Sequence, residues 1–156
     1  MNTYKNENAL VEDSWKQIRA RYPDAYLIKI NGGMYQESGI PDVLHCIEGL
    51  FIGIEYKHQK PGESREHALE RVTLKQRQHI VRIVKAGGMA GVALTPDAAL
   101  EIVKLARLKA KMLARGDDPK HFPLPPDWDA LMSVPASRVV NVDEVQINPT
   151  PLKKEK

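Results

Sequence analysis

The chain has 156 residues, 42% of them hydrophobic, and a formal net charge of only +3. This length and composition suit one domain with an ordinary packed core, and the charge alone does not indicate a nucleic-acid-binding protein. No apolar run is long enough to cross a membrane, and the polar, acid-containing residues 1–12 do not resemble a secretory signal. The single cysteine, Cys46, excludes an intramolecular disulfide, so we expect a cytoplasmic protein.

The first third of the chain predicts one helix followed by strands. Apolar residues recur at helical spacing over residues 7–22, with Asn6 as a candidate N-cap. Short apolar runs rich in strand-forming residues follow at 25–30, 42–47 and 50–57. The last two runs are separated only by a Glu-Gly turn signal, which predicts an antiparallel hairpin.

The middle of the chain predicts a helix, a strand and a second helix. Residues 58–72 are polar and are expected to form a loop. Thr73 is a candidate cap for a helix over 74–86, whose buried stripe would include Leu74, Val81 and Val84; a glycine pair ends this helix before a strand at 89–94. A Thr-Pro pair at 95–96 then opens a helix that extends to about residue 115.

The predicted order up to residue 94 is α-β-β-β-α-β, which is an α/β fold with a mixed central sheet flanked by helices. Residues 1–116 would form this domain, including its C-terminal helix. Residues 117–156 are rich in proline and are expected to form an irregular extension, with one strand over 139–147 and a disordered end from 149. Four residues would pack this extension on the same domain: Phe122, Leu124, Trp128 and Leu131.

Two carboxylates and a lysine are predicted to meet on the hairpin. Because side chains alternate along a strand, Glu55 and Lys57 share one face, and the turn brings Asp42 of the partner strand close to both. Gly53 on the same face would leave room beside Glu55. Carboxylates at such short distances repel each other unless a cation neutralises them, and Mg²⁺ or Mn²⁺ prefers such oxygen ligands. Lys57 would then orient the attacking water or stabilise charge on a phosphate.

The motif resembles the PD-(D/E)XK nuclease superfamily and is most similar to its VRR-NUC branch, which includes small stand-alone phage-type and bacterial nucleases. The resemblance covers about residues 5–95 and leaves the last third unexplained. It is carried by Gly-Ile-Pro-Asp ending at residue 42, by Glu-Tyr-Lys at 55–57, and by the flanking segments 73–76 and 86–88. It implies a restriction-endonuclease-like α-β-β-β-α-β core.

The resemblance also implies roles for individual residues. Asp42 and Glu55 would bind the metal with the backbone carbonyl of Tyr56, and Lys57 would be the catalytic lysine. A glutamate of the first helix usually completes the site. Glu7 is preferred because it lies on the apolar stripe of that helix, where a carboxylate needs a reason, and Glu12 is the reserve. The simpler alternative is that Glu7 lies in the first turn only because a negative charge there interacts favourably with the helix dipole.

Nucleic-acid contacts are predicted on the basic stretch and beside the motif. Residues 57–85 contain eight lysines or arginines against three glutamates. A solvated helix face explains this stretch about as well. A glutamine at position 76 recurs in the resembled branch. The candidates for nucleic-acid contact are Gln76, Lys75, Arg82, Lys29 and Gln36.

The expected function is that of a Mg²⁺- or Mn²⁺-dependent endonuclease that hydrolyses phosphodiester bonds of DNA. The resemblance implies flapped or branched DNA, such as a Holliday junction, and a homodimer. No phosphate-cradling loop is present at 31–33, so no nucleotide cofactor is expected. Two alternatives remain open: a non-catalytic nucleic-acid-binding or assembly module on the same fold, and an RNA-processing nuclease.

Overall fold

The protein is a four-stranded mixed sheet with helices on both faces. The computed structural model describes residues 4–133, so the strand predicted over 139–147 and the disordered end predicted from 149 lie outside the described residues. The sheet order is β1-β2-β3-β4, and only the β3–β4 pair is parallel. The strands are β1 (Tyr26–Lys29), β2 (Val43–Ile47), β3 (Leu50–Tyr56) and β4 (Met89–Ala93).

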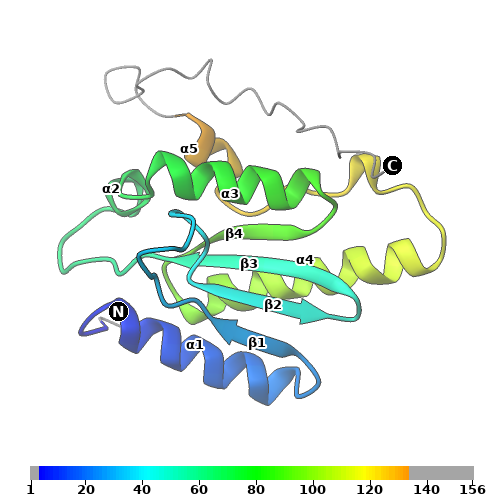
Figure 1. The fold of residues 1–156 in the computed structure, drawn as a ribbon, viewed down its shortest axis with the longest axis horizontal. Helices are drawn as coiled ribbons and strands as arrows, with labels where there is room; N and C mark the ends of the chain where they lie inside the picture. Colours follow the sequence, from blue (N-terminus) through cyan, green and yellow to red (C-terminus); the bar gives the residue numbers. More distant parts are fainter. Residues whose placement is uncertain (1–3, 134–156) are drawn as a thin grey trace.

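The helices cover the two faces of the sheet unequally (Figure 1). Helices α1 (Glu7–Arg21) and α4 (Pro96–Ala114) pack against each other on one face. Helix α3 (Leu74–Lys85) packs on the opposite face, mainly against β3 and β4. The predicted α-β-β-β-α-β order is confirmed, because α1, β1, β2, β3, α3 and β4 follow one another along the chain apart from one short extra helix.

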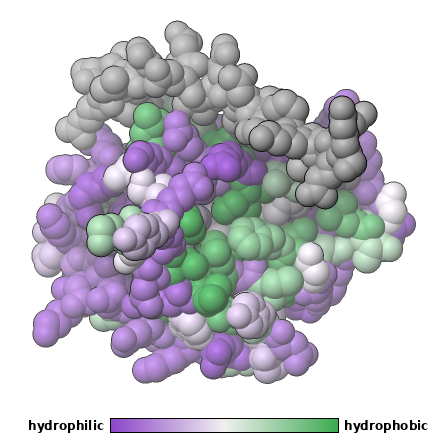
Figure 2. Space-filling view, viewed as in Figure 1, coloured by the Kyte–Doolittle hydropathy of each residue, from purple (hydrophilic) through white to green (hydrophobic). Residues whose placement is uncertain are grey.

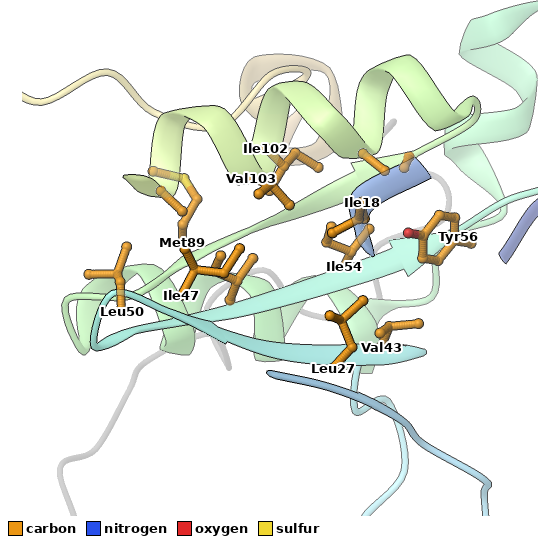
Figure 3. Close-up of a cluster of buried hydrophobic side chains, with 14 of the residues drawn as sticks. Ile18, Leu27, Val43, Ile47, Leu50, Ile54, Tyr56, Met89, Ile102 and Val103 are labelled. Atoms are coloured by element: carbon orange, nitrogen blue, oxygen red, sulfur yellow. The ribbon is translucent and has the colours of Figure 1, made fainter. Parts of the chain in front are cut away.

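The main core lies between the sheet and the pair α1 and α4 (Figure 3). Alternate residues of β3, among them Ile52 and Ile54, point into it and have no exposed surface. Ile102 and Val103 of α4 close it from the other side. A second, smaller core lies under α3 and is built around Ile80 and Val92.

The helix starts follow the chemistry that the sequence indicates. The Asn6 side chain accepts a hydrogen bond from the Ala9 N–H, as expected of an N-cap. Thr73 caps α3 in a reciprocal arrangement with Gln76, and Thr95 caps α4 before a proline at its first turn. At the β2–β3 turn, Glu48 and Gly49 both have positive φ, which is typical of a tight hairpin.

Several details of the predicted elements are wrong. Residues 58–72 are not all loop, because Ser64 caps a short helix, α2 (Arg65–Glu70), that buries Ala68 and Leu69. Leu74 is exposed, because the buried stripe of α3 is centred on Ile80 and Val81.

The extension after α4 is also more ordered than predicted. It forms a 3₁₀ turn (Pro119–His121) and a short helix, α5 (Trp128–Met132). Leu131 is buried, and Phe122 and Trp128 are partly buried against the cores, as predicted, but Leu124 is exposed. The buried Arg77 side chain of α3 donates hydrogen bonds to the carbonyls of Leu69, Val72 and Leu131, which ties α2 and α5 to α3.

One half of the sheet face on the α3 side is open. Tyr26, Cys46 and Phe51 are paired across β1, β2 and β3 on this face and are all exposed. Figure 2, drawn from the same side as Figure 1, shows apolar surface gathered over this part of the sheet. Among the described residues, no helix has the length and apolar character needed to cross a membrane.

Candidate active site

The predicted carboxylates and lysine meet where β3 ends. Glu55 and Lys57 lie on the face of β3 opposite the main core, because Ile54 and Tyr56 take the alternate positions. The hairpin pairs Val43 with Ile54, so the preceding residue, Asp42, lies beside the end of β3. Asp42, Glu55 and Lys57 therefore come together as the spacing of the motif predicts.

Backbone hydrogen bonds hold Asp42 on both sides. Its carboxylate Oδ2 accepts the Tyr56 N–H at 2.8 Å, and its carbonyl accepts the Ile30 N–H, also at 2.8 Å. The Asp42 carboxylate thereby takes the place of the next β2–β3 ladder bond. The expected role of the Tyr56 carbonyl stays a prediction, because the contact seen here is made by the Tyr56 N–H.

Glu55 and Lys57 form a buried ion pair. The Lys57 Nζ lies 2.7 Å from Glu55 Oε1, and the two residues are only 8% and 1% exposed. Gln76 Nε2 donates to the same Glu55 oxygen at 2.5 Å. The other oxygen, Oε2, is buried without a hydrogen-bond partner among the described residues. The charge on Glu55 is thus only partly compensated, and a buried charge requires a partner.

Gln76 is held in the orientation that this contact requires. Its Oε1 accepts the Thr73 N–H at 2.9 Å as part of the cap of α3, so its Nε2 faces Glu55. The cap that starts α3 therefore also positions a donor at the site. Gln76 contacts the carboxylate cluster directly, and its predicted contact with nucleic acid stays a prediction.

Burial and mutual repulsion keep the carboxylates from ionising readily. Burial, and then the nearby Asp42 carboxylate, raise the pKa of Glu55 to about 7 against the opposing effect of Lys57. Burial also raises the pKa of Asp42, although the Tyr56 N–H and Lys57 act to lower it. Carboxylates with pKa values perturbed by burial and by a specific charged neighbour cluster at functional sites.

The structure distinguishes the two candidate glutamates of α1 by their positions relative to the carboxylate cluster. Glu7 Oε1 lies 3.9 Å from Lys57 Nζ, and Glu7 Oε2 accepts the His58 N–H at 3.3 Å. Glu12 is exposed on α1, and none of its contacts reaches this cluster among the residues described. The structure therefore places the preferred residue, and not the reserve, at the site.

Sequence reasoning missed the segment that holds the start of α1 over the site. The His58 ring contacts the Tyr4 carbonyl, and the Tyr4 hydroxyl donates to Asp13 at 2.5 Å. These contacts join the residue after the motif to the N-terminal side of α1, close to Glu7. The sequence carries no spacing signal for the contact between His58 and Tyr4, because these two residues lie 54 positions apart.

The predicted nucleic-acid contacts lie around the site, and three of the cations already have protein partners. Lys75 Nζ donates to Ser38 Oγ at 2.8 Å, Arg82 pairs with Glu37 at 3.1 Å, and Lys29 donates to Asn8 at 3.2 Å. The first two contacts fasten the 31–40 loop to α3. Gly39 makes this possible, because a Cβ there would lie 2.6 Å from the Lys75 backbone.

The sequence predicted that Gly53 would leave open room beside Glu55, and this prediction is wrong. A Cβ at this position would lie 2.8 Å from Ile83 and 3.0 Å from Pro41. Ile83 of α3 and Pro41 therefore fill this space. The absence of a side chain at Gly53 lets α3 approach β3 closely enough for Gln76 to reach Glu55.

The donor set fits a small divalent cation in part. Among residues 4–133, no group of three or more His, Cys, Asp or Glu side chains is arranged to enclose a metal ion. The fit rests on two side chains: Asp42 and Glu55 repel each other, and Glu55 Oε2 is buried without a partner. Mg²⁺ and Mn²⁺ suit such a site, since they are bound by one or two carboxylates and keep several waters.

Comparison with known proteins found nothing that assigns the chain to a family: no family model matches it, and no curated protein or solved structure matches it.

Proposed function

We propose that the protein is a Mg²⁺- or Mn²⁺-dependent endonuclease that hydrolyses phosphodiester bonds in DNA, with flapped or branched DNA as its preferred substrate. The observation that carries the proposal is the cluster at the end of β3. Two carboxylates with raised pKa values lie there beside a buried lysine, and one carboxylate oxygen has no partner. A protein that only binds a polyanion gains nothing from buried carboxylates, which repel phosphate.

In this proposal Asp42 and Glu55 hold the metal, which supplies positive charge to the scissile phosphate. Lys57 stabilises the charge that develops on the phosphate and orients the attacking water, because its ammonium lies at the same cluster. Gln76 holds the Glu55 carboxylate in place by a hydrogen bond. Glu7, at the start of α1, holds the Lys57 ammonium by an ion pair. The homodimer and the branched substrate are predictions from the family resemblance.

One observation favours the non-catalytic alternative. Lys57 and Gln76 already contact Glu55 Oε1, so the cluster could be an ion pair that needs no metal. An RNA substrate would use the same chemistry. The two alternatives predict different outcomes of the cleavage assay.

The test is cleavage of labelled linear, flapped and four-way-junction DNA, and of an RNA hairpin, with Mg²⁺, Mn²⁺ or EDTA. We expect metal-dependent cutting of DNA that Lys57→Ala lowers by at least about a hundredfold, while DNA binding persists. The matched control is Lys104→Ala, which removes an exposed lysine of α4 and should cut like the wild type. Binding without cleavage would support the binding module, and cleavage of RNA alone would support the RNA nuclease.

A further inference from the structure

The loop between β1 and β2 holds a cavity next to the candidate active site. The cavity has a volume of about 400 Å³, within the range of small-molecule sites. Its lining includes Asp42 together with residues of the loop, among them the apolar Ile30 and Ile40 and the polar Gln36, Glu37 and Ser38. Whatever occupies it therefore contacts Asp42, a residue that is proposed to bind the metal.

The tip of the same loop exposes two apolar side chains almost completely. Met34 is 89% exposed and Tyr35 is 98% exposed, whereas the next most exposed large hydrophobic side chain of residues 4–133 is Tyr26, at 65%. A single exposed apolar residue requires no explanation, but two adjacent ones at a loop tip beside a site suggest a ligand. A tyrosine ring is a stacking surface for a nucleobase.

The second half of the loop is fastened to α3, whereas its tip is open. Ser38 and Glu37 fasten its second half to Lys75 and Arg82 of α3, and a Gln36 N–H to Gly33 carbonyl bond of 3.0 Å closes a turn around the tip. The tip is thus held at a set distance from Asp42 while its side chains remain accessible.

Two basic side chains of α3, Lys75 and Arg82, contact the same loop. The partner of the Lys75 ammonium is the neutral Ser38 hydroxyl, so this contact does not neutralise the ammonium. The Arg82–Glu37 pair is exposed on both sides, and exposed pairs are weak enough to exchange for a phosphate. The charges and the cavity therefore fit a nucleotide better than an apolar ligand.

We propose that this loop, with the cavity and the exposed Tyr35 at its tip, binds one unpaired nucleotide next to the scissile phosphate. The proposal rests on the proposed nuclease function and specifies its substrate. A base inside a duplex has neighbours on both faces, so only an unpaired base can stack on Tyr35 at the tip of the loop. The enzyme would thus require a single-stranded segment at the junction that it cuts.

The experiment measures DNA binding in EDTA, so that it does not depend on cleavage. The probes are a forked duplex with 2-aminopurine at its first unpaired position and a blunt duplex of the same length. We expect wild type to prefer the fork and to quench the 2-aminopurine fluorescence. Tyr35→Ala should weaken fork binding about 5- to 150-fold and remove the quenching, while blunt-duplex binding stays unchanged. Tyr35→Phe should keep both properties, because it retains the ring.

Two further variants keep the test decisive. Tyr26→Ala removes an exposed tyrosine from the open sheet face and should bind both probes like the wild type. Gly33→Phe adds a side chain to the cavity wall where a Cβ has no atom within 4 Å, so it should fold and should lose only the preference for the fork.

Equal wild-type affinity for the two probes would overturn the inference, and so would fork binding by Tyr35→Ala or Gly33→Phe within twofold of wild type. Each of these results leaves the nuclease proposal standing. No binding of either probe would also overturn the inference, whereas the nuclease proposal is tested separately by the cleavage assay with Mg²⁺ or Mn²⁺.

Discussion

The two faces of β3 both carry buried side chains, which are apolar on one face and charged on the other. On one face Ile52, Ile54 and Tyr56 are buried against α1 and α4, and burial of each such side chain contributes about 1.5–3 kcal/mol. On the other face Glu55 and Lys57 are almost as deeply buried, where removal of a charge from water is costly even when it is paired. Stability alone explains the first face, whereas we propose that the charges of the second face serve the metal-dependent function.

The first prediction concerns the apolar face. Ile54→Ala should destabilise the protein by about 2–5 kcal/mol, because it opens a cavity in a core position with no exposed surface. The free energy of unfolding in urea measures this, and cleavage by the folded fraction should persist. Phe51→Ala, on the other face and half exposed, should cost about 1 kcal/mol or less. Equal costs for both variants would remove the distinction between the faces.

The second prediction concerns His45, a buried residue of β2 whose ring nitrogens have no partner among the described residues. Burial lowers its pKa from 6.5 to about 4, so the unfolded chain binds a proton more readily than the folded protein. Stability from the neutral ring is therefore present above pH 6.5 and is lost as the pH falls toward 4. The loss should reach about 2 kcal/mol near pH 5, relative to pH 8.

His45→Leu should remove this part of the pH dependence, measured by urea unfolding at both pH values. His121→Leu, at an exposed histidine, is the matched control and should behave like the wild type. The same pH dependence in wild type and His45→Leu would show that His45 does not carry the effect.

The third prediction separates the two glutamates of α1. Glu7→Gln should lower metal-dependent cleavage about ten- to hundredfold, because Glu7 contacts Lys57 and His58 from outside the carboxylate pair. Glu12→Gln should cleave like the wild type, since Glu12 is exposed on α1. Loss of activity in Glu12→Gln alone would reverse this assignment.

The sequence predicts the parts of the molecule whose signals are local. Periodicity, caps and turn residues are sufficient for the order of the elements, and strand alternation with a tight turn is sufficient to bring Asp42 to Glu55. Contacts over long separations have no such signal. The packing of Gly39 and Gly53 against α3 depends on how closely that helix approaches, and no local pattern sets this distance.

Calorimetric titration of Mn²⁺ into the metal-free protein, wild type beside Glu55→Gln, tests the central claim most directly. The account predicts that wild type binds Mn²⁺ and that Glu55→Gln weakens the affinity at least about tenfold, because it removes the carboxylate whose second oxygen has no partner. Wild-type affinity in Glu55→Gln, or no binding by the wild type, would show that the buried charges of β3 are an ion pair and not a metal site.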